Sequence, residues 1–292
     1  GRMIRVEIDP ENDEPIPGAA RRSKHDALRS RLRTTTRTEV GAVTTRGRIV
    51  RFTAVDLPSV PSTSIQLAAG AKAGEYLALE RGESVLAIVD LEADRPIALG
   101  TRAGVVKRVT PGGWPAKPSF EIIALKPGDE VVGAAQGTEA DELVFVTSDA
   151  QLLHFASTAV RPQGTAAGGM AGISVGAGAT VIYFGVLDPA ADLVVVTQST
   201  SSQTIAGVDP GRVKVASFAD FPGKGRATGG VRSHAFLKGE DALALAWVGP
   251  MPALAVGTDG SARTLPEERG KRDGSGIPVD AALGSIGEAL SG

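Results

Sequence analysis

Four segments of the chain repeat one another without a gap, and this repeat constrains the fold more than any other feature of the sequence. Each segment begins with a glycine, carries two apolar runs separated by a turn, and ends with a threonine 19 positions later. The pairs are Gly82 and Thr101, Gly128 and Thr147, Gly178 and Thr197, and Gly239 and Thr258. Short β-branched runs around a turn are typical of an antiparallel hairpin, and a constant length fixes its register. We therefore expect each segment to form a hairpin.

A tight turn and a third apolar run follow most of these threonines, as in TRAGVVKRV from Thr101 and TSDAQLLHF from Thr147. The same form begins at Thr44, and the opening residues GRMIRVEI match it from the turn onward. Successive threonines at 44, 101, 147, 197 and 258 are 57, 46, 50 and 61 residues apart. With a truncated unit over residues 1–35 and a closing segment over 260–292, the chain has about six units.

Repeats of three to four short strands at this spacing are typical of radial all-β architectures, which close on themselves and so protect their sheet edges. We therefore predict that residues 1–292 form one all-β domain, a propeller-like disc of six four-stranded blades. An open spiral is the alternative to a closed disc. The length differences all lie between a third strand and the next glycine, so these connections are loops on a constant scaffold, where function usually lies.

Several classes of site and location are disfavoured by composition. The chain has no cysteine, which excludes a disulfide framework, a thiolate nucleophile and a zinc finger. Its three histidines are spread over 210 positions, so we expect no metal site. No apolar run approaches the ~20 residues of a membrane span and no signal-peptide pattern is present, so we expect a cytoplasmic protein without a membrane partner.

Charge is distributed unevenly along the chain. The total is -2, but the stretch from Arg21 to Arg51 holds ten basic residues against two acidic ones, a local +8 that leaves -10 elsewhere. A second basic excess lies between Arg212 and Arg232. Because salt screens surface charges beyond about 10 Å, a ligand responds to such patches and not to the total. A near-neutral total therefore does not exclude a nucleic-acid partner.

Three loops have the composition of an anion-binding surface. The arginine-rich connection over residues 14–40 offers forked donors that suit phosphate oxygens. The segments RPQGTAAGGMAGI at 161–173 and FPGKGRATGGVR at 221–232 are rich in glycine, which lets backbone amides approach a phosphate. The alternatives are a solvated basic linker for the first loop and sharp connections between strands for the other two.

Motifs typical of enzymes are weak. The G-x-S-x-G match around Ser174 follows a glycine loop and precedes a strand, whereas a nucleophile elbow needs a strand before it and a helix after it. Neither glycine loop completes a nucleotide-binding motif. The acidic residues between Glu80 and Asp94 are interpreted as solvated hairpin ends, and His154 as a structural or surface residue. We therefore predict no catalytic residues.

The repeated T-x-x-G strand pairs, the blade spacing and FPGKGRATGGVR at 221–232 together resemble the C-terminal domain of the A subunit of bacterial type IIA topoisomerases, the gyrase and topoisomerase IV family. The resemblance covers essentially the whole chain. It implies a β-pinwheel, a propeller-like disc whose neighbouring blades share strands. It also implies that the domain binds and bends duplex DNA on a basic perimeter and presents the transported segment to the catalytic core.

Two departures from the family's patterns bear on function. The Q-R-R-G-G-K-G box of gyrases is missing, which favours a topoisomerase IV-like protein. The family's active-site tyrosine with its preceding arginine is also missing, because Tyr76 and Tyr183 lie in other contexts. The resemblance thus implies a non-catalytic, nucleoid-associated domain without a cofactor of its own. The other parts of an ATP-dependent isomerase would supply ATP and Mg chemistry, and its partners would be the ATPase B subunit and the cleavage-religation core of its own polypeptide.

The candidate DNA contacts are arginines and lysines of the basic connection, the third strands and the two glycine loops. They are Arg21, Arg22, Lys24, Arg29, Arg31, Arg33, Arg37, Arg46, Arg48, Arg51, Lys107, Arg108, Arg161, Lys224, Arg226 and Arg232. Two alternatives stay open. One is a propeller-like scaffold that binds protein partners through the acidic remainder of its surface; the other is a hydrolytic or glycan-active propeller.

Overall fold

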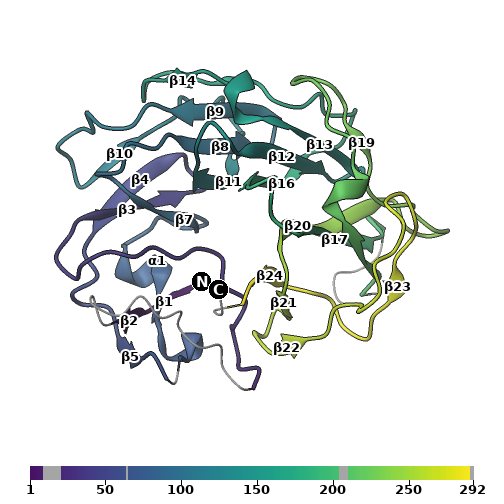
Figure 1. Cartoon of the computed structure of the whole chain (residues 1–292), viewed down its shortest axis with the longest axis horizontal. Helices are drawn as coiled ribbons and strands as arrows, with labels where there is room; N and C mark the ends of the chain where they lie inside the picture. Colours follow the sequence, from purple (N-terminus) through teal and green to yellow (C-terminus); the bar gives the residue numbers. More distant parts are fainter. Residues whose placement is uncertain (9–20, 64, 204–209, 290–292) are drawn as a thin grey trace.

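Five small sheets, which we call blades, follow one another around a common axis in the computed structural model (Figure 1). The structure describes residues 1–8, 21–63, 65–203 and 210–289. The all-β, propeller-like architecture predicted from the repeat is confirmed, but the predicted number of six blades is wrong, because the described residues form five.

From the rim of the ring to its axis, the first blade holds β10 (Ser119–Glu121), β4 (Arg48–Phe52), β3 (Val40–Thr44) and β7 (Val85–Asp90). In the same order, the second holds β14 (Pro162–Gln163) with β15 (Met170–Ala171), β9 (Val105–Val109), β8 (Ile97–Thr101) and β11 (Val131–Gln136). The third holds β19 (Val231–Arg232), β13 (Gln151–Ala156), β12 (Glu142–Thr147) and β16 (Val181–Leu187). The fourth holds β23 (Ile277–Pro278), β18 (Arg212–Ser217), β17 (Leu193–Thr200) and β20 (Ala242–Pro250), and the fifth β22 (Ala262–Arg263), β21 (Ala253–Val256) and β24 (Ser285–Glu288).

Neighbouring blades exchange strands. The outer strand β10 follows β9 of the second blade in sequence but pairs with β4 of the first. In the same way β14 and β15 of the second blade, β19 of the third and β23 of the fourth each come from the chain after the next blade's third strand. A blade is therefore complete only when the following unit has added its outer strand.

The predicted hairpin within each glycine-to-threonine segment is wrong. β7 and β8 lie in one such segment, but β7 pairs with β3 in the first blade and β8 with β9 and β11 in the second. The segment therefore runs from the innermost strand of one blade to the next blade. The predicted tight turn after the threonine does form a hairpin, as in β8–β9 and β12–β13.

Backbone geometry explains why the ends of the repeat are glycine and threonine. The glycines that begin the four segments all have positive φ, between 76° and 97°, a conformation that favours glycine. In two of the four segments the threonine hydroxyl accepts a hydrogen bond from the amide four residues later, at 3.2 Å from Val105 to Thr101 and 3.1 Å from Gln151 to Thr147. It thus closes the turn into the third strand.

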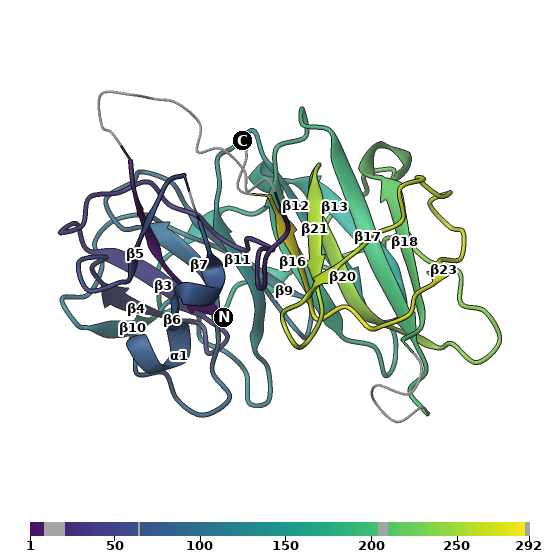
Figure 2. The ribbon, with the colours of Figure 1, turned by 90° about the horizontal axis from the view of Figure 1, so that it is seen from below.

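The described residues of the truncated N-terminal unit do not form a sixth blade. β1 (Arg2–Met3) pairs with β6 (Ala71–Lys72), and β2 (Arg5–Glu7) pairs in parallel with β5 (Ser59–Pro61). The short helix α1 (Ala73–Tyr76) follows β6, and further helical turns, all of the 3-10 type, lie at 67–69, 157–159 and 218–220. The two-stranded pieces lie between the first and last blades (Figures 1 and 2).

The apolar core lies between blades. Val144 and Leu152 of the third blade pack in one cluster with Val195 and Val248 of the fourth. Three similar clusters join the first and second, the second and third, and the fourth and fifth blades. Burial of apolar area contributes roughly 25 cal/mol per Å². The ring is therefore stabilised chiefly by contacts between neighbours.

One buried ion pair yields a prediction for acid stability. Glu83 accepts two hydrogen bonds from Arg48, at 2.6 and 2.7 Å, and one from Thr44 at 2.6 Å. These bonds, that to Arg48 foremost, lower the pKa of Glu83 to about 2. A lowered carboxyl pKa contributes stability that is complete above the ordinary pKa and is lost as the pH falls toward 2.

We expect Glu83→Gln to lower the free energy of unfolding by about 3 kcal/mol at pH 7, because it leaves a largely buried guanidinium without its carboxylate. The loss should shrink as the pH falls from 4.5 toward 2. Urea unfolding at pH 7 and pH 3 measures both effects. The exposed neighbour Glu80 provides the matched control as Glu80→Gln, and an equal loss in both variants would contradict the prediction.

Candidate nucleic-acid interface

The loops that carry the outer strands touch one another around the rim and form a continuous surface, which we call the belt: residues 110–124, 161–173, 221–232 and 264–276. The amide of Ala124 donates to the carbonyl of Ala167 at 3.2 Å. The amide of Ala227 donates to the carbonyl of Gly172 at 2.7 Å, and the guanidinium of Arg272 to the carbonyl of Arg232 at 3.0 Å. In Figure 1 the strands β10, β14 and β19 lie within the belt, and β23 directly follows its last loop.

Glycine in the belt serves close packing. Gly169 and Gly230 have φ of +82° and +76°, and a Cβ at either would lie 2.7 Å from the carbonyl of Val106 or 2.5 Å from that of Leu152. At these two positions glycine is explained by the approach of the loop to the third strand beneath it, whereas a Cβ at Gly164 or Gly225 would meet no atom within 4 Å.

The net positive charge of the belt is concentrated in its loop 221–232. The loop 221–232 has Lys224, Arg226 and Arg232 and no acidic residue, and Lys224 and Arg232 are exposed. Arg161 is the exposed cation of the preceding loop. The predicted cations of the two glycine loops therefore do lie together along one rim.

A third cationic loop was not predicted from the sequence. Arg269, Lys271 and Arg272 lie in the belt loop 264–276, which also holds three acidic residues, Glu267, Glu268 and Asp273. Arg269 and Lys271 are exposed, although Arg269 pairs with Asp192 at 2.8 Å. Its place in the repeat could have revealed it. The loop follows Thr258 and a third strand, just as 221–232 follows Thr197 and a third strand.

Two of the predicted DNA contacts are buried, and the structure does not support a surface role for them. The Lys107 side chain has no exposed area, and its ammonium donates to the carbonyls of Ile122, Thr165 and Ala167 at 2.7 to 3.0 Å. Arg108 is 2% exposed; it donates to backbone carbonyls and pairs with Glu139. Both side chains hold belt or turn segments and do not reach the surface.

Other blades use the same anchoring principle. The Lys214 ammonium has four carbonyl oxygens within hydrogen-bond distance for its three N–H groups, and three of these oxygens lie in the loop 264–276. His154 contacts Glu142 through Nδ1 and the carbonyl of Phe221 through Nε2 at 2.9 Å. Burial lowers the pKa of both Lys107 and Lys214 to about 8, so both remain charged at neutral pH. Polar side chains on third strands, Lys107, Lys214 and His154, thus fix the loops that form the belt.

In the first blade the predicted cations differ in how far their guanidinium groups are exposed to solvent. Arg48 is tied to Glu83, and Arg51 pairs with Glu39 and donates to the carbonyl of Pro115 at 3.1 Å. Arg46 is exposed, 3.9 Å from the carboxylate of Glu80. Arg46 alone of these three retains a largely solvent-facing guanidinium.

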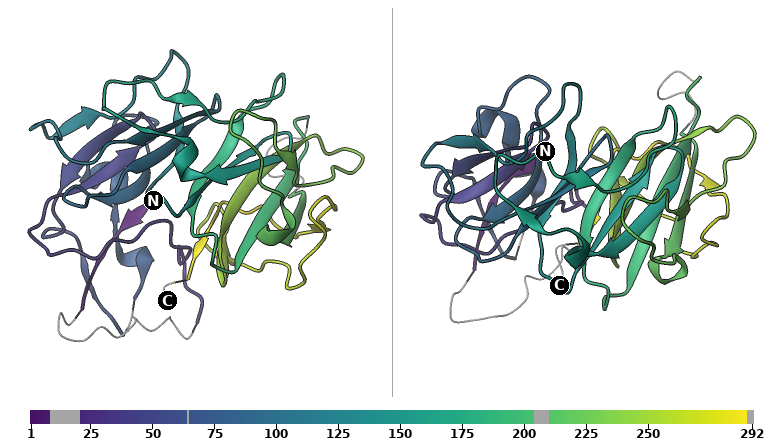
Figure 3. Two further views of the ribbon diagram at one scale, coloured as in Figure 1. Left: turned by 45° about the horizontal axis from the view of Figure 1, so that its top comes forward. Right: turned by 90° about the horizontal axis from the view of Figure 1, so that it is seen from above.

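The basic connection becomes a strap, defined as residues 21–38, that passes from the fifth blade to the first (Figure 3, left). All of its predicted cations are exposed, but the guanidinium of Arg22 is bound to Asp26 and to backbone carbonyls; the others are Arg21, Lys24, Arg29, Arg31, Arg33 and Arg37. Arg22 donates to the carbonyl of Arg263, next to the last loop of the belt, at 3.3 Å. The amide of Leu28 donates to the carbonyl of Glu288, on the innermost strand β24 of the fifth blade, at 3.0 Å. The strap thus begins beside the belt and approaches the axis.

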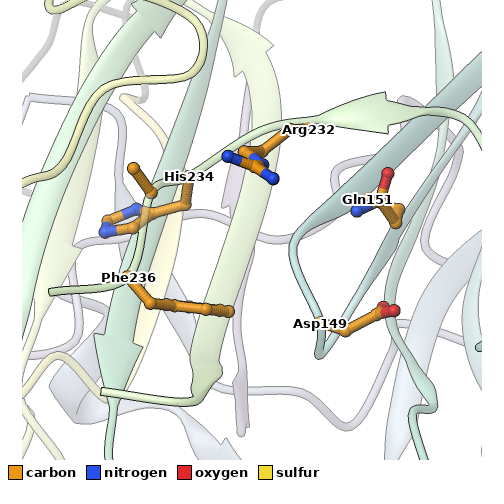
Figure 4. A pocket seen from close by; sticks show the side chains of 6 residues that line it. Asp149, Gln151, Arg232, His234 and Phe236 are labelled. Carbon is orange, nitrogen blue, oxygen red and sulfur yellow. The ribbon is translucent and has the colours of Figure 1, made fainter. Parts of the chain in front are cut away.

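A cleft of about 290 Å³ lies at the base of loop 221–232, lined by Asp149, Gln151, Arg232, His234, Ala235 and Phe236 (Figure 4). Burial lowers the pKa of His234 to about 4, so the ring is neutral at pH 7, and its Nδ1 lies 2.9 Å from the hydroxyl of Thr197. Figure 4 shows Arg232 and Phe236 projecting into the cleft. No activated nucleophile is assembled among these side chains.

Possible metal ligands, the two tyrosine hydroxyls and the character of the helices also bear on function. Within the described ranges, no group of three or more acidic or histidine residues could hold a metal ion. The hydroxyls of Tyr76 and Tyr183 donate to the carbonyls of Thr53 and Val248 at 2.8 and 2.7 Å. Among the helices that the structure describes, none has the length and apolar character needed to cross a membrane.

Comparison with known proteins gives consistent matches. A family model described as "DNA gyrase C-terminal domain, beta-propeller" matches residues 141–188 and 211–241. The A subunit of DNA gyrase from Mycobacterium tuberculosis is 30% identical over 195 residues, 64% of this chain and 22% of that protein. "Topoisomerase subunit TopoM" of Mycolicibacterium smegmatis is 28% identical over 184 residues, 61% of this chain and 23% of that protein. The matched part is thus about a fifth of the length of these relatives.

Two solved structures share the fold. The C-terminal domain of DNA topoisomerase IV superposes with a TM-score of 0.70 and 19% identity, covering 86% of this chain and 79% of that one. The DNA gyrase A C-terminal domain gives a TM-score of 0.64 and 17% identity, covering 88% of this chain and 83% of that one.

The anchoring role of the buried lysines can be tested by stability. We expect Lys107→Met and Lys214→Met each to lower the free energy of unfolding by about 2 kcal/mol, because three or four buried carbonyls lose their donor. Arg161→Met, which removes an exposed cation, should change it by less than about 0.5 kcal/mol. Urea denaturation measures all three, and lysine variants as stable as the Arg161 variant would show that the anchors are dispensable.

Proposed function

We propose that this chain, which belongs to the family of C-terminal domains of type IIA topoisomerase A subunits, binds duplex DNA along its belt. The observation that carries the proposal is the contact between successive cationic loops on one rim. Arg161, Lys224, Arg226 and Arg232 are followed along this rim by the cations of 269–276. A linear array of this kind suits the regularly spaced phosphates of a duplex.

The side chains of the belt favour binding to the backbone over reading of bases. Its cations are arginine and lysine, which bind phosphate oxygens, and loop 221–232 contains no asparagine or glutamine to pair with an adenine edge. A duplex that follows the rim also has to curve. Bending a short duplex costs a few kcal/mol, which additional phosphate contacts along the arc can offset. Binding should therefore depend on salt and on DNA deformability.

In the complete protein we infer a supporting role for the domain. It would hold the transported DNA segment and present it to the cleavage-religation core of the same polypeptide, within an ATP-dependent topoisomerase that includes an ATPase B subunit. The missing Q-R-R-G-G-K-G string supports a topoisomerase IV-like assignment over a gyrase with chiral wrapping. The domain itself would take no part in cleavage, since both of its tyrosine hydroxyls are bound to backbone carbonyls.

Charge reversal in the belt tests DNA binding. We expect the triple variant Lys224→Glu, Arg226→Glu and Arg232→Glu to weaken binding of a duplex of about 40 base pairs by about 100-fold at 50 mM salt. The slope of log affinity against log salt should also fall, because fewer counterions are released. Fluorescence anisotropy over a series of salt concentrations measures both quantities.

A matched control separates position from net charge. The variant Lys72→Glu, Arg81→Glu and Arg95→Glu makes the same change in charge at exposed positions outside the belt. It should retain most of the affinity. Equal losses in the two variants, or wild-type binding that does not respond to salt, would overturn the proposal and favour a protein-binding scaffold.

A further inference from the structure

The fifth and first blades meet without strand exchange in the described part of the chain. At the four other junctions an outer strand of one blade comes from the next unit. β22 at the edge of the fifth blade has no outer strand among the described residues, and β5 and β6 pair instead with β2 and β1. Closure at this junction therefore requires another physical link.

The strap attaches to the fifth blade by several hydrogen bonds. The Arg22 guanidinium donates to the carbonyl of Ala255 at 2.7 Å and to that of Arg263 at 3.3 Å, on the two paired strands β21 and β22. Asp26 holds this guanidinium through two further bonds, at 2.6 and 2.9 Å. An arginine side chain thus caps carbonyls at the edge where an outer strand is missing from the described residues.

Backbone pairing extends the attachment toward the axis. Leu28 and Glu288 exchange both amide-to-carbonyl hydrogen bonds, at 3.0 and 2.9 Å, so the strap forms a bridge with the innermost strand β24. Gly287 makes this approach possible. A Cβ at Gly287 would lie 2.2 Å from the carbonyl oxygen of Leu28, and the nearest atoms it would meet all belong to the strap.

The other end of the strap reaches the first blade. The amide of Ile88, on the innermost strand β7, donates to the hydroxyl of Ser30 at 3.0 Å. Glu39 then pairs with Arg51 on β4, and the chain enters β3 at Val40. The segment 22–30 therefore connects the last blade to the first through side-chain and backbone bonds (Figures 2 and 3).

We propose that the strap is the clasp that closes the ring between the fifth and first blades. Releasing it separates these two blades and leaves the four strand-exchanged junctions intact. The exposed cations of the strap then have a fixed position next to the last loop of the belt only while the clasp is closed. This conformational role is independent of whether the domain binds DNA.

Gly287→Ala provides a specific way to open the clasp, because its methyl group clashes with the strap backbone. The chain has no cysteine, so a dye pair can be attached at Glu92→Cys, beyond the first blade's β7, and Glu267→Cys, after the fifth blade's β22; both positions are exposed. Single-molecule energy transfer without DNA then reports the distance between the blades. We expect a single narrow distribution in the parent and a longer, broader one in Gly287→Ala.

A second variant and a control complete the test. The double variant Arg22→Ala and Ser30→Ala removes the attachment at each end without adding bulk, and should also lengthen the distance. Gly164→Ala adds a methyl group where no atom lies within 4 Å and should change nothing. Circular dichroism verifies folding; if Gly287→Ala unfolds, the double variant decides. Parent-like distances in the folded variants would overturn the clasp.

Discussion

Exchange of the outer strand between consecutive blades is the constraint on which the rest of this structure depends. A third strand such as β4 or β13 has one edge paired within its own unit and the other edge completed by the chain that follows. This pairing forces each connection to cross from one blade to its neighbour along the rim. The belt is the direct result, because the crossing segments are laid end to end. The pairing of strands therefore determines how far apart the cations of the belt lie.

Burial divides the basic residues of this chain into two groups with different tasks. Lys107, Lys214 and Arg108 lie beneath the loops and bind backbone carbonyls, whereas Lys224, Arg232 and Lys271 lie on top of them. An ammonium surrounded by carbonyls fixes a glycine-rich loop that has few side chains of its own to pack. Buried basic residues thus support the loops from below, and a separate set of basic residues forms the exposed surface of the same loops.

Sequence periodicity predicted the all-β class and the turns after the threonines, because these depend on local backbone geometry. It could not predict that β7 and β8 lie in different blades, since a hairpin and a crossing between blades have the same alternation of apolar run, turn and apolar run. The same limit explains the wrong blade number: GRMIRVEI has the pattern of a third strand, but its partners are supplied by 59–61 and 71–72. Burial of Lys107 was likewise invisible, because its acceptors are carbonyls up to 60 residues away. The exposed cations of 221–232 could be predicted because glycines and basic residues occur together in this short segment.

The glycine-to-threonine repeat and the blade are out of phase, since each repeat starts on the inner strand of one blade and ends on the second strand of the next. Removing or duplicating one full period of the sequence would therefore leave every remaining strand with a partner in the same relative position. Judged by strand pairing alone, one period more or fewer inside the chain would leave no strand edge unpaired at the internal junctions. Among the described residues only the junction between the fifth and first blades lacks an exchanged strand, so a change in the number of blades would have to be accommodated at that junction.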